Sequence, residues 1–173
     1  HIPAAKATRI YQALEKFAGY GFNASHAAAY ALIAYQCAWL KSHHPAEFMA
    51  ATLTSEMSDS SRIVTLIVEC RRMGLAILPP EVNRSEWRFS IEDGAIRVGL
   101  GAVRNVGQGA IEGLLAARAG EGAGPFRDLF DLARRADSRT LNRRVLESLV
   151  AAGACDALGE ERGAVVAIDP QTG

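Results

Sequence analysis

The stretch that decides the fold of this chain is Gly99-Leu100-Gly101-Ala102-Val103-Arg104-Asn105-Val106-Gly107-Gln108-Gly109-Ala110-Ile111. Its pattern predicts a short helix, a Gly-x-Gly turn and a second helix that continues to about Arg118. Glycines let such a turn lie flat against a phosphate, and the backbone N–H groups that open the next helix point towards it. Gly107, Gln108 and Gly109 are therefore candidate phosphate-binding residues.

A turn of this kind between two helices is typical of the helix-hairpin-helix motif. A phosphate carries no base identity, so the contact would not depend on DNA sequence. Arg104 and Arg118 flank the turn and would add positive charge. The alternative is a tight turn that only closes a helix pair and binds no ligand.

Positive charge gathers again between residues 126 and 144. Six arginines stand against three aspartates there: Arg127, Arg134, Arg135, Arg139, Arg143 and Arg144 against Asp128, Asp131 and Asp137. This excess predicts a phosphate-binding face, with Arg143 as a further candidate contact. A solvated helix surface of mixed charge explains the segment equally well. Asp128 and Asp131 are expected to stabilise the start of a helix.

The composition limits the choice of function. The 173 residues carry no net charge, so an argument for nucleic-acid binding must rest on such local patches. Cys37, Cys70 and Cys155 lie far apart without any CxxC pair, so we expect no zinc site and three thiols in a reducing compartment, as small core residues. No apolar run is long enough to cross a membrane. The start without methionine suggests a fragment of a longer protein.

The remaining patterns predict a chain that is mainly α with a small β-hairpin. Helices are expected at about residues 3–19, 25–42 and 45–55 and before Gly74. The hairpin joins residues 87–91 to 96–98 through a turn centred on Asp93-Gly94. We expect four segments: helices in 1–74, a connector with the hairpin in 75–98, a helix-hairpin-helix domain in 99–159 and an atypical tail in 160–173, read as strand and turn.

A second glycine-rich stretch precedes the helix at 25–42, and it reads Gly19-Tyr20-Gly21-Phe22-Asn23-Ala24-Ser25-His26-Ala27-Ala28-Ala29-Tyr30. Ser25 is a good N-cap, and His26 would lie in the first turn, where anions are favoured. Asn23, Ser25 and His26 are therefore candidate phosphate or nucleotide contacts, although a capped helix with a surface histidine is an equal alternative. The helix is apolar on most of its surface, so we expect it to be central and buried.

Several runs together resemble a known family, the alpha subunits of bacterial DNA polymerase III, which are C-family replicative polymerases. The runs include residues 17–32, 44–51, 69–74, 78–83, 99–103 and 141–149, and the resemblance covers about residues 3–159. It implies that the first region is the later part of the fingers domain and that the third is the helix-hairpin-helix domain that grips duplex DNA. The tail departs from the family pattern.

The resemblance also implies an activity for the parent protein. It would be a DNA-directed DNA polymerase, a nucleotidyltransferase that adds deoxynucleoside triphosphates to a primer 3′ end by two-metal phosphoryl transfer with Mg²⁺. The metal-binding aspartates would lie upstream, so the fragment is expected to bind no cofactor and to be inactive alone. Expected partners are primer–template DNA and nucleotides, with the sliding clamp and other replisome subunits bound mostly elsewhere in a cytoplasmic protein. The alternative is a non-catalytic helical structural or protein-interaction module without direct DNA contact.

Overall fold

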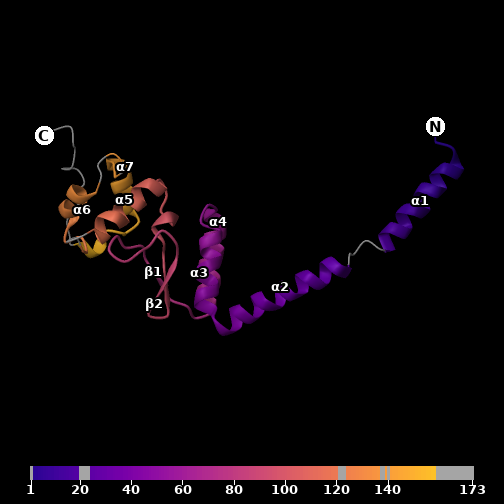
Figure 1. The fold of residues 1–173 in the computed structure, drawn as a ribbon, viewed down its shortest axis with the longest axis horizontal. Coiled ribbons are helices and arrows are strands. Elements are labelled where there is room, and N and C mark those ends of the chain that lie inside the picture. The colour runs from indigo at the N-terminus through magenta and orange to yellow at the C-terminus, as the bar shows by residue number, and fades with distance from the viewer. Residues whose placement is uncertain (1, 20–23, 121–123, 137–138, 140, 159–173) are drawn as a thin grey trace. The chain divides into compact units, whose positions relative to one another are not determined.

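The computed structural model describes residues 2–19, 24–120, 124–136, 139 and 141–158 (Figure 1). The chain is mainly helical with one small sheet, which confirms the predicted fold class. It divides into two compact units, His1–His43 and His44–Gly173. The predicted strand and turn of the tail lie outside the described residues.

The first unit contains the helices α1 (Ala4–Gly19) and α2 (Ala24–His43). Two expectations about α2 were wrong. Ser25 is the second residue of the helix rather than its cap, because Ala24, the residue type with the highest helix propensity, already belongs to it. The expected burial is not found either, since none of the residues of α2 is buried and Tyr30 and Ile33 are more than half exposed. No residue of α1 is buried either, so the apolar surface of α2 is not covered within the first unit.

The second unit begins with α3 (Pro45–Ser55) and α4 (Ser60–Arg72), which pack on a three-stranded sheet. Pro45 suits the first position of α3, where its missing N–H has no helical acceptor to lose. Asp59 caps α4 by accepting hydrogen bonds from the N–H groups of Ser61 and Arg62. The hydrogen bond from the Ser61 hydroxyl is the main reason that the pKa of Asp59 lies below its ordinary value. The buried residues shared by these helices and the sheet are Ala46, Met49, Ala50, Leu53, Cys70, Phe89 and Ile96.

The sheet has the order β1-β3-β2, from β1 (Ile77–Leu78), β2 (Ser90–Glu92) and β3 (Ala95–Arg97). The hairpin of β2 and β3 was predicted, and Asp93 and Gly94 at its turn have the positive φ angles that a two-residue turn of this type requires. The sequence placed the first strand too early, because the carbonyl of Trp87 accepts a hydrogen bond from Gly101 of η1, and Phe89 N–H donates to the Thr54 hydroxyl of α3. It also missed the parallel pairing of β1 with β3, which joins residues far apart in the chain.

The rest of the unit is a helical group: η1 (Leu100–Ala102), α5 (Gln108–Ala119), α6 (Leu129–Arg135), α7 (Arg143–Ala151) and η2 (Asp156–Leu158). In Figure 1 the strands lie between α3–α4 and this group. Its core includes Leu100, Ile111, Leu114, Leu132 and Leu149, each at most 1% exposed. Gly153 ends α7 with φ +76, and Ala154 N–H then donates back to Leu149 at 2.9 Å.

No helix among the described residues is both long and apolar enough to cross a membrane.

Candidate nucleic-acid interface

The turn predicted to bind phosphate lies between η1 and α5. The first helix of the predicted pair is shorter than expected, a single 3₁₀ turn. Val103 and Val106 close the connection through a backbone hydrogen bond of 3.4 Å, and Asn105 between them has φ +62. Val106 is buried, so the turn is anchored in the core on one side and exposed on the other. The predicted order of a short helix, a turn and a second helix is confirmed.

The segment before β2 holds η1, which leads into this turn. Leu100 N–H donates to the backbone carbonyl of Glu86 at 2.8 Å, and Gly101 N–H donates to the backbone carbonyl of Trp87 at 3.0 Å. A Cβ on Gly99 would stand 2.4 Å from the backbone of Arg88, and one on Gly101 would stand 2.9 Å from Trp87. Such distances are too short for real Cβ atoms, so internal packing requires glycine at both positions.

Gly107 and Gly109, unlike Gly99 and Gly101, are not required by internal packing. Gly107 precedes α5 with an ordinary φ of −77°, and Gly109 lies in the first turn of the helix. Apart from the chain neighbours and the adjacent helix backbone, no atom of the described residues lies within 4 Å of the place where a Cβ would stand on either glycine. Neither backbone conformation nor internal packing therefore explains why these positions lack a side chain. The missing side chains leave the backbone at the start of α5 open to close approach from solvent.

Gln108 lies between the two glycines and is exposed. Its amide donates to the Glu112 carboxylate at 2.7 Å, so the side chain lies along the helix. No side chain caps α5, which leaves N–H groups at its start without a side-chain acceptor. These groups and the helix dipole favour an anion at this position.

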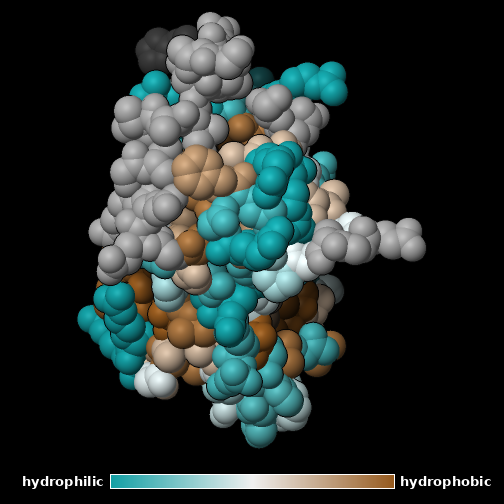
Figure 2. Space-filling model, turned by 90° about the vertical axis from the view of Figure 1, so that its left-hand side faces the viewer, coloured by the Kyte–Doolittle hydropathy of each residue, from teal (hydrophilic) through white to brown (hydrophobic). Residues whose placement is uncertain are grey.

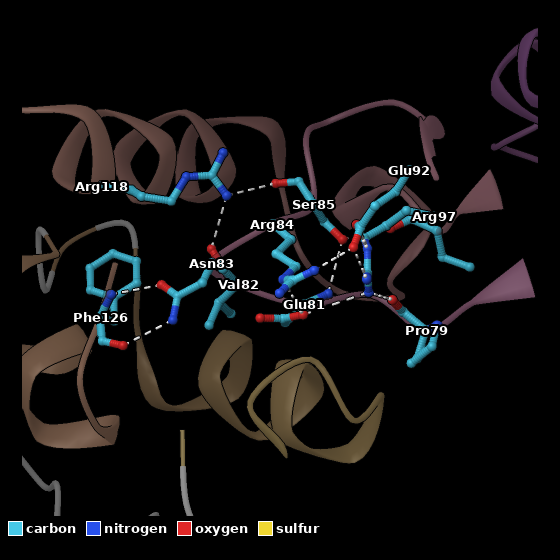
Figure 3. A network of polar contacts seen from close by, with 11 residues as sticks. Pro79, Glu81, Val82, Asn83, Arg84, Ser85, Glu92, Arg97, Arg118 and Phe126 are labelled. Atoms are coloured by element: carbon cyan, nitrogen blue, oxygen red, sulfur yellow. Dashed lines mark hydrogen bonds and ion pairs between the residues drawn. The ribbon is translucent and has the colours of Figure 1, made fainter. Parts of the chain in front are cut away.

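Arg118 does not serve this site, contrary to the expectation from the sequence. It lies in the last turn of α5, and its side chain is only 16% exposed. The guanidinium donates to the carbonyls of Val82 and Ser85 (Figure 3), and it also pairs with the Glu86 carboxylate at 3.0 Å. Its charge thus ties α5 to the segment that follows the first strand and is not available for a ligand.

Arg97 of β3, whose side chain is buried, contacts the same segment (Figure 3). Its Nη1 donates to Pro79 O at 2.8 Å and its Nη2 to Glu92 at 2.9 Å, while Glu81 lies at 3.7 Å. The hydrogen bonds that Arg97 donates to the Glu92 carboxylate, with another from Arg84, lower the pKa of Glu92 from 4.5 to about 2. Arg97 therefore ties the segment of Pro79 and Glu81 to β3, the strand that leads into η1.

The basic segment is also partly structural. Asp128 caps α6 as predicted, accepting from Asp131 N–H at 2.7 Å. The carboxylate of Asp131 is buried, and the hydrogen bond from Arg127 N–H is the main reason that its pKa is lowered. Arg135 binds this carboxylate at 3.1 Å and also lies over the Phe126 ring, at 4.6 Å from its centroid. Arg135 is therefore a packing residue.

Arg127 and Arg134 form longer ion pairs with the Asp131 carboxylate, with nitrogen–oxygen distances of 4.0 and 3.5 Å. Their side chains are 81% and 73% exposed. A single carboxylate thus faces three guanidinium groups, and the segment keeps an excess of positive charge. Figure 2 shows a hydrophilic band down the middle of the visible face, with apolar side chains beside its lower part.

An internal repeat was missed from the sequence. Residues 106–115 and 141–150 have the same order of buried, half-buried and exposed positions. Asn142 precedes α7 as Gly107 precedes α5, and it accepts from Val145 N–H at 3.1 Å. Arg143 pairs with Glu147 at 2.9 Å, as Gln108 pairs with Glu112. The start of α7 is therefore a second copy of the start of α5, with two arginines in place of Gln108-Gly109.

The repeated spacing is visible in the sequence as an apolar residue, three polar or small residues, two apolar residues and a glutamate. It could have identified the second copy.

The second copy contacts the turn that leads into the first copy. Arg144 Nη2 donates to Asn105 Oδ1 at 3.2 Å, although the two residues are far apart in sequence. Arg104 is exposed and forms no ion pair with the described residues. A groove of about 440 Å³ runs beside the turn, lined by Pro80, Val98, Ala102, Val103, Arg104, Asn105, Ser148, Ala151 and Ala152. Arg104 and Arg144 thus add positive charge around the exposed side of the turn.

The candidate site in the first unit is less complete. Asn23 lies outside the described residues. Ser25 and His26 are exposed in the first turn of α2, and the His26 ring lies 4.2 Å from that of Tyr30, centroid to centroid. Among the described residues there is no group of three metal-ligating side chains. The cysteines were predicted as core residues, which holds for Cys70 and Cys155 but is wrong for Cys37, exposed on α2.

Comparison with known proteins agrees with this geometry. A family model described as a helix-hairpin-helix motif matches residues 74–165, which is more than half of the chain. This chain belongs to the helix-hairpin-helix family. The match includes the turn, both copies of the repeat and the sheet that supports them.

The chain is also similar to longer bacterial proteins. It is 52% identical over 166 residues to DNA polymerase III subunit alpha of Escherichia coli (strain K12), covering 95% of this chain and 14% of that protein. The same subunit of Vibrio cholerae serotype O1 is 51% identical over 162 residues, and that of Haemophilus influenzae 55% over 158. These matches confirm the predicted resemblance to alpha subunits. The chain spans about 14% of the length of these relatives.

Proposed function

We propose that this chain is part of a replicative DNA-directed DNA polymerase and that its second unit binds the backbone of duplex DNA. The start of α5 carries this proposal. Gly107 and Gly109 leave open a helix start that has no side-chain cap, and nothing inside the described structure requires a glycine at either place. A phosphate oxygen accepts hydrogen bonds from such N–H groups, and the helix dipole adds to the attraction.

Arg143 and Arg104 are the proposed cationic contacts beside this turn. Arg143 occupies the place in the second copy that Gln108 has in the first, so both copies would face a phosphate in the same way. Glu147 partly neutralises Arg143 in the free protein at 2.9 Å, and DNA would compete for the guanidinium. Arg104 has no such competitor among the described residues.

The test is binding of a short duplex at low and moderate salt, because phosphate contacts weaken steeply as salt rises. The chain should bind duplexes of unrelated sequence with similar affinity. A variant with Gly107→Val and Gly109→Val should lose most of this binding while remaining folded. Unchanged affinity of that variant would contradict the proposal.

The first unit is proposed to lie near the incoming nucleotide or the primer–template end, through Asn23, Ser25 and His26. Its support is the place of Ser25 and His26 in the exposed first turn of α2, together with the similarity to alpha subunits. In the full-length parent, His26→Ala should then reduce the efficiency of primer extension. Extension at unchanged efficiency would remove His26 from the site.

Polymerase activity itself is proposed for the parent protein and not for this chain. Two-metal phosphoryl transfer needs clustered carboxylates, and the resemblance to alpha subunits, of which this chain spans about 14%, would place them in another part of the parent. The Mg²⁺ ligands, and the contacts to the sliding clamp and other replisome subunits, would then come mostly from other parts of a cytoplasmic parent.

A second function, protein–protein interaction, is favoured by one observation on the first unit. Large apolar side chains are exposed along both of its helices, among them Tyr11, Leu14, Phe17, Tyr30 and Ile33. Exposed apolar surface of this extent marks a site of contact with other protein surface. If DNA affinity does not respond to changes in the turn, the whole chain is better explained as an interaction module.

A further inference from the structure

We propose that Arg144 is a positioning residue for the phosphate-binding turn, acting through Asn105. The inference rests on the proposed function of the turn. It concerns a hydrogen bond from the second copy of the repeat to the residue that precedes the first copy, from Arg144 Nη2 to Asn105 Oδ1 at 3.2 Å. Asn105 lies two residues before Gly107, so this bond reaches the backbone that leads directly into the candidate site.

The backbone at Asn105 gives the bond its importance. Its φ of +62 lies in the left-handed region, which asparagine tolerates better than most residues but which still costs free energy. The only backbone hydrogen bond across the turn, among the described residues, is the 3.4 Å contact from Val106 N–H to Val103. A turn that is held so weakly by its own backbone gains order from a side-chain contact made by another helix.

The stability of α7 does not explain Arg144. The residue is the second of the helix, where a positive charge opposes the helix dipole, and no acidic residue stands in that first turn. Arg143 beside it pairs with Glu147, but Arg144 forms no ion pair with the described residues. A guanidinium placed at some cost to its own helix and directed at the turn is consistent with a role at the turn.

The experiment measures duplex DNA affinity of the whole chain for Arg144→Ala, Asn105→Gly and the double variant. Glycine adopts a positive φ without strain, so Asn105→Gly removes the hydrogen bond while keeping the charge of Arg144 and the path of the backbone. Each single variant should weaken binding by about three- to tenfold, as expected for one hydrogen bond that orders a site. The double variant should be no weaker than the single variants, because both remove the same bond.

The dependence of affinity on salt separates positioning from direct phosphate contact. If Arg144 contacted a phosphate directly, Arg144→Ala would make the slope of log affinity against log salt shallower by about 0.9, the contribution of one phosphate contact. Asn105→Gly would then leave DNA affinity unchanged. That result, or unchanged affinity in both single variants, would overturn the inference.

Arg72→Ala is the matched control, since it removes an equal charge from an exposed position at the end of α4. It should bind DNA like the unchanged chain, and thermal unfolding should show that all variants are folded. If the Gly107 and Gly109 variant also binds normally, the proposed function fails. If only that variant loses binding, the function stands and the role of Arg144 is wrong.

Discussion

Gly109→Ala should make the protein more stable and a weaker DNA binder. Gly109 lies in the first turn of α5, and a Cβ there would meet no atom within 4 Å among the described residues outside its chain neighbours and its own helix backbone. Alanine is favoured over glycine in a helix by about 0.5–1 kcal/mol, so the free energy of unfolding should rise by about that amount. A new methyl group at the same place would hold a phosphate away from the backbone N–H groups.

The expected loss of affinity is larger than the gain in stability. Hydrogen bonds to a charged group contribute about 1.5–3 kcal/mol, and each 1.4 kcal/mol is a factor of ten in Kd, so binding should weaken by roughly tenfold to a hundredfold. Denaturant unfolding and fluorescence anisotropy with a labelled duplex at low salt measure the two quantities on one sample.

The control is Ala116→Gly, an exposed position further along the same helix. It should lower the free energy of unfolding by about 0.5–1 kcal/mol and leave DNA affinity unchanged. The reasoning is refuted if Gly109→Ala binds DNA like the unchanged chain. It is also refuted if that variant is less stable, since the glycine would then be required by the fold.

Three further predictions concern the rest of the described structure. Arg97→Leu should lower the free energy of unfolding by about 2–3 kcal/mol, less than for a fully buried pair because Glu92 keeps some exposure, and urea denaturation would measure it. The pKa of Glu92 is lowered to about 2 in the folded protein, so the contribution of its carboxylate to stability is complete above pH 4.5 and is lost as the pH falls towards 2. The difference in Tm between the unchanged chain and Glu92→Gln should therefore shrink as the pH falls over that range. A constant difference would contradict the assignment. A thiol reagent should label Cys37 rapidly and Cys155 slowly, because Cys37 is exposed while burial raises the pKa of the Cys155 thiol to about 12, and equal rates by mass spectrometry would count against this.

The sequence determined those features that depend on neighbouring residues. The start of α4 follows from Asp59, the hairpin turn from Asp93-Gly94 and the helix after Gly107 from its local pattern. The order of the elements in the helix-hairpin-helix could be predicted for the same reason, since the turn and both flanking elements lie within one short stretch. Local backbone preferences and side-chain caps act over a few residues and can be recognised without a fold.

Tertiary structure alone decided which groups are free to act. Arg118 and Arg104 look alike beside the turn, but only folding brings the carbonyls of Val82 and Ser85 to Arg118. Gly101 and Gly107 belong to one glycine-rich run, yet one is packed against Trp87 and the other is open to solvent. The bond from Arg144 to Asn105 joins two helices whose proximity no local pattern encodes. Packing between distant segments assigns each charge and each glycine to structure or to binding, because burial and hydrogen-bond partners exist only once those segments meet.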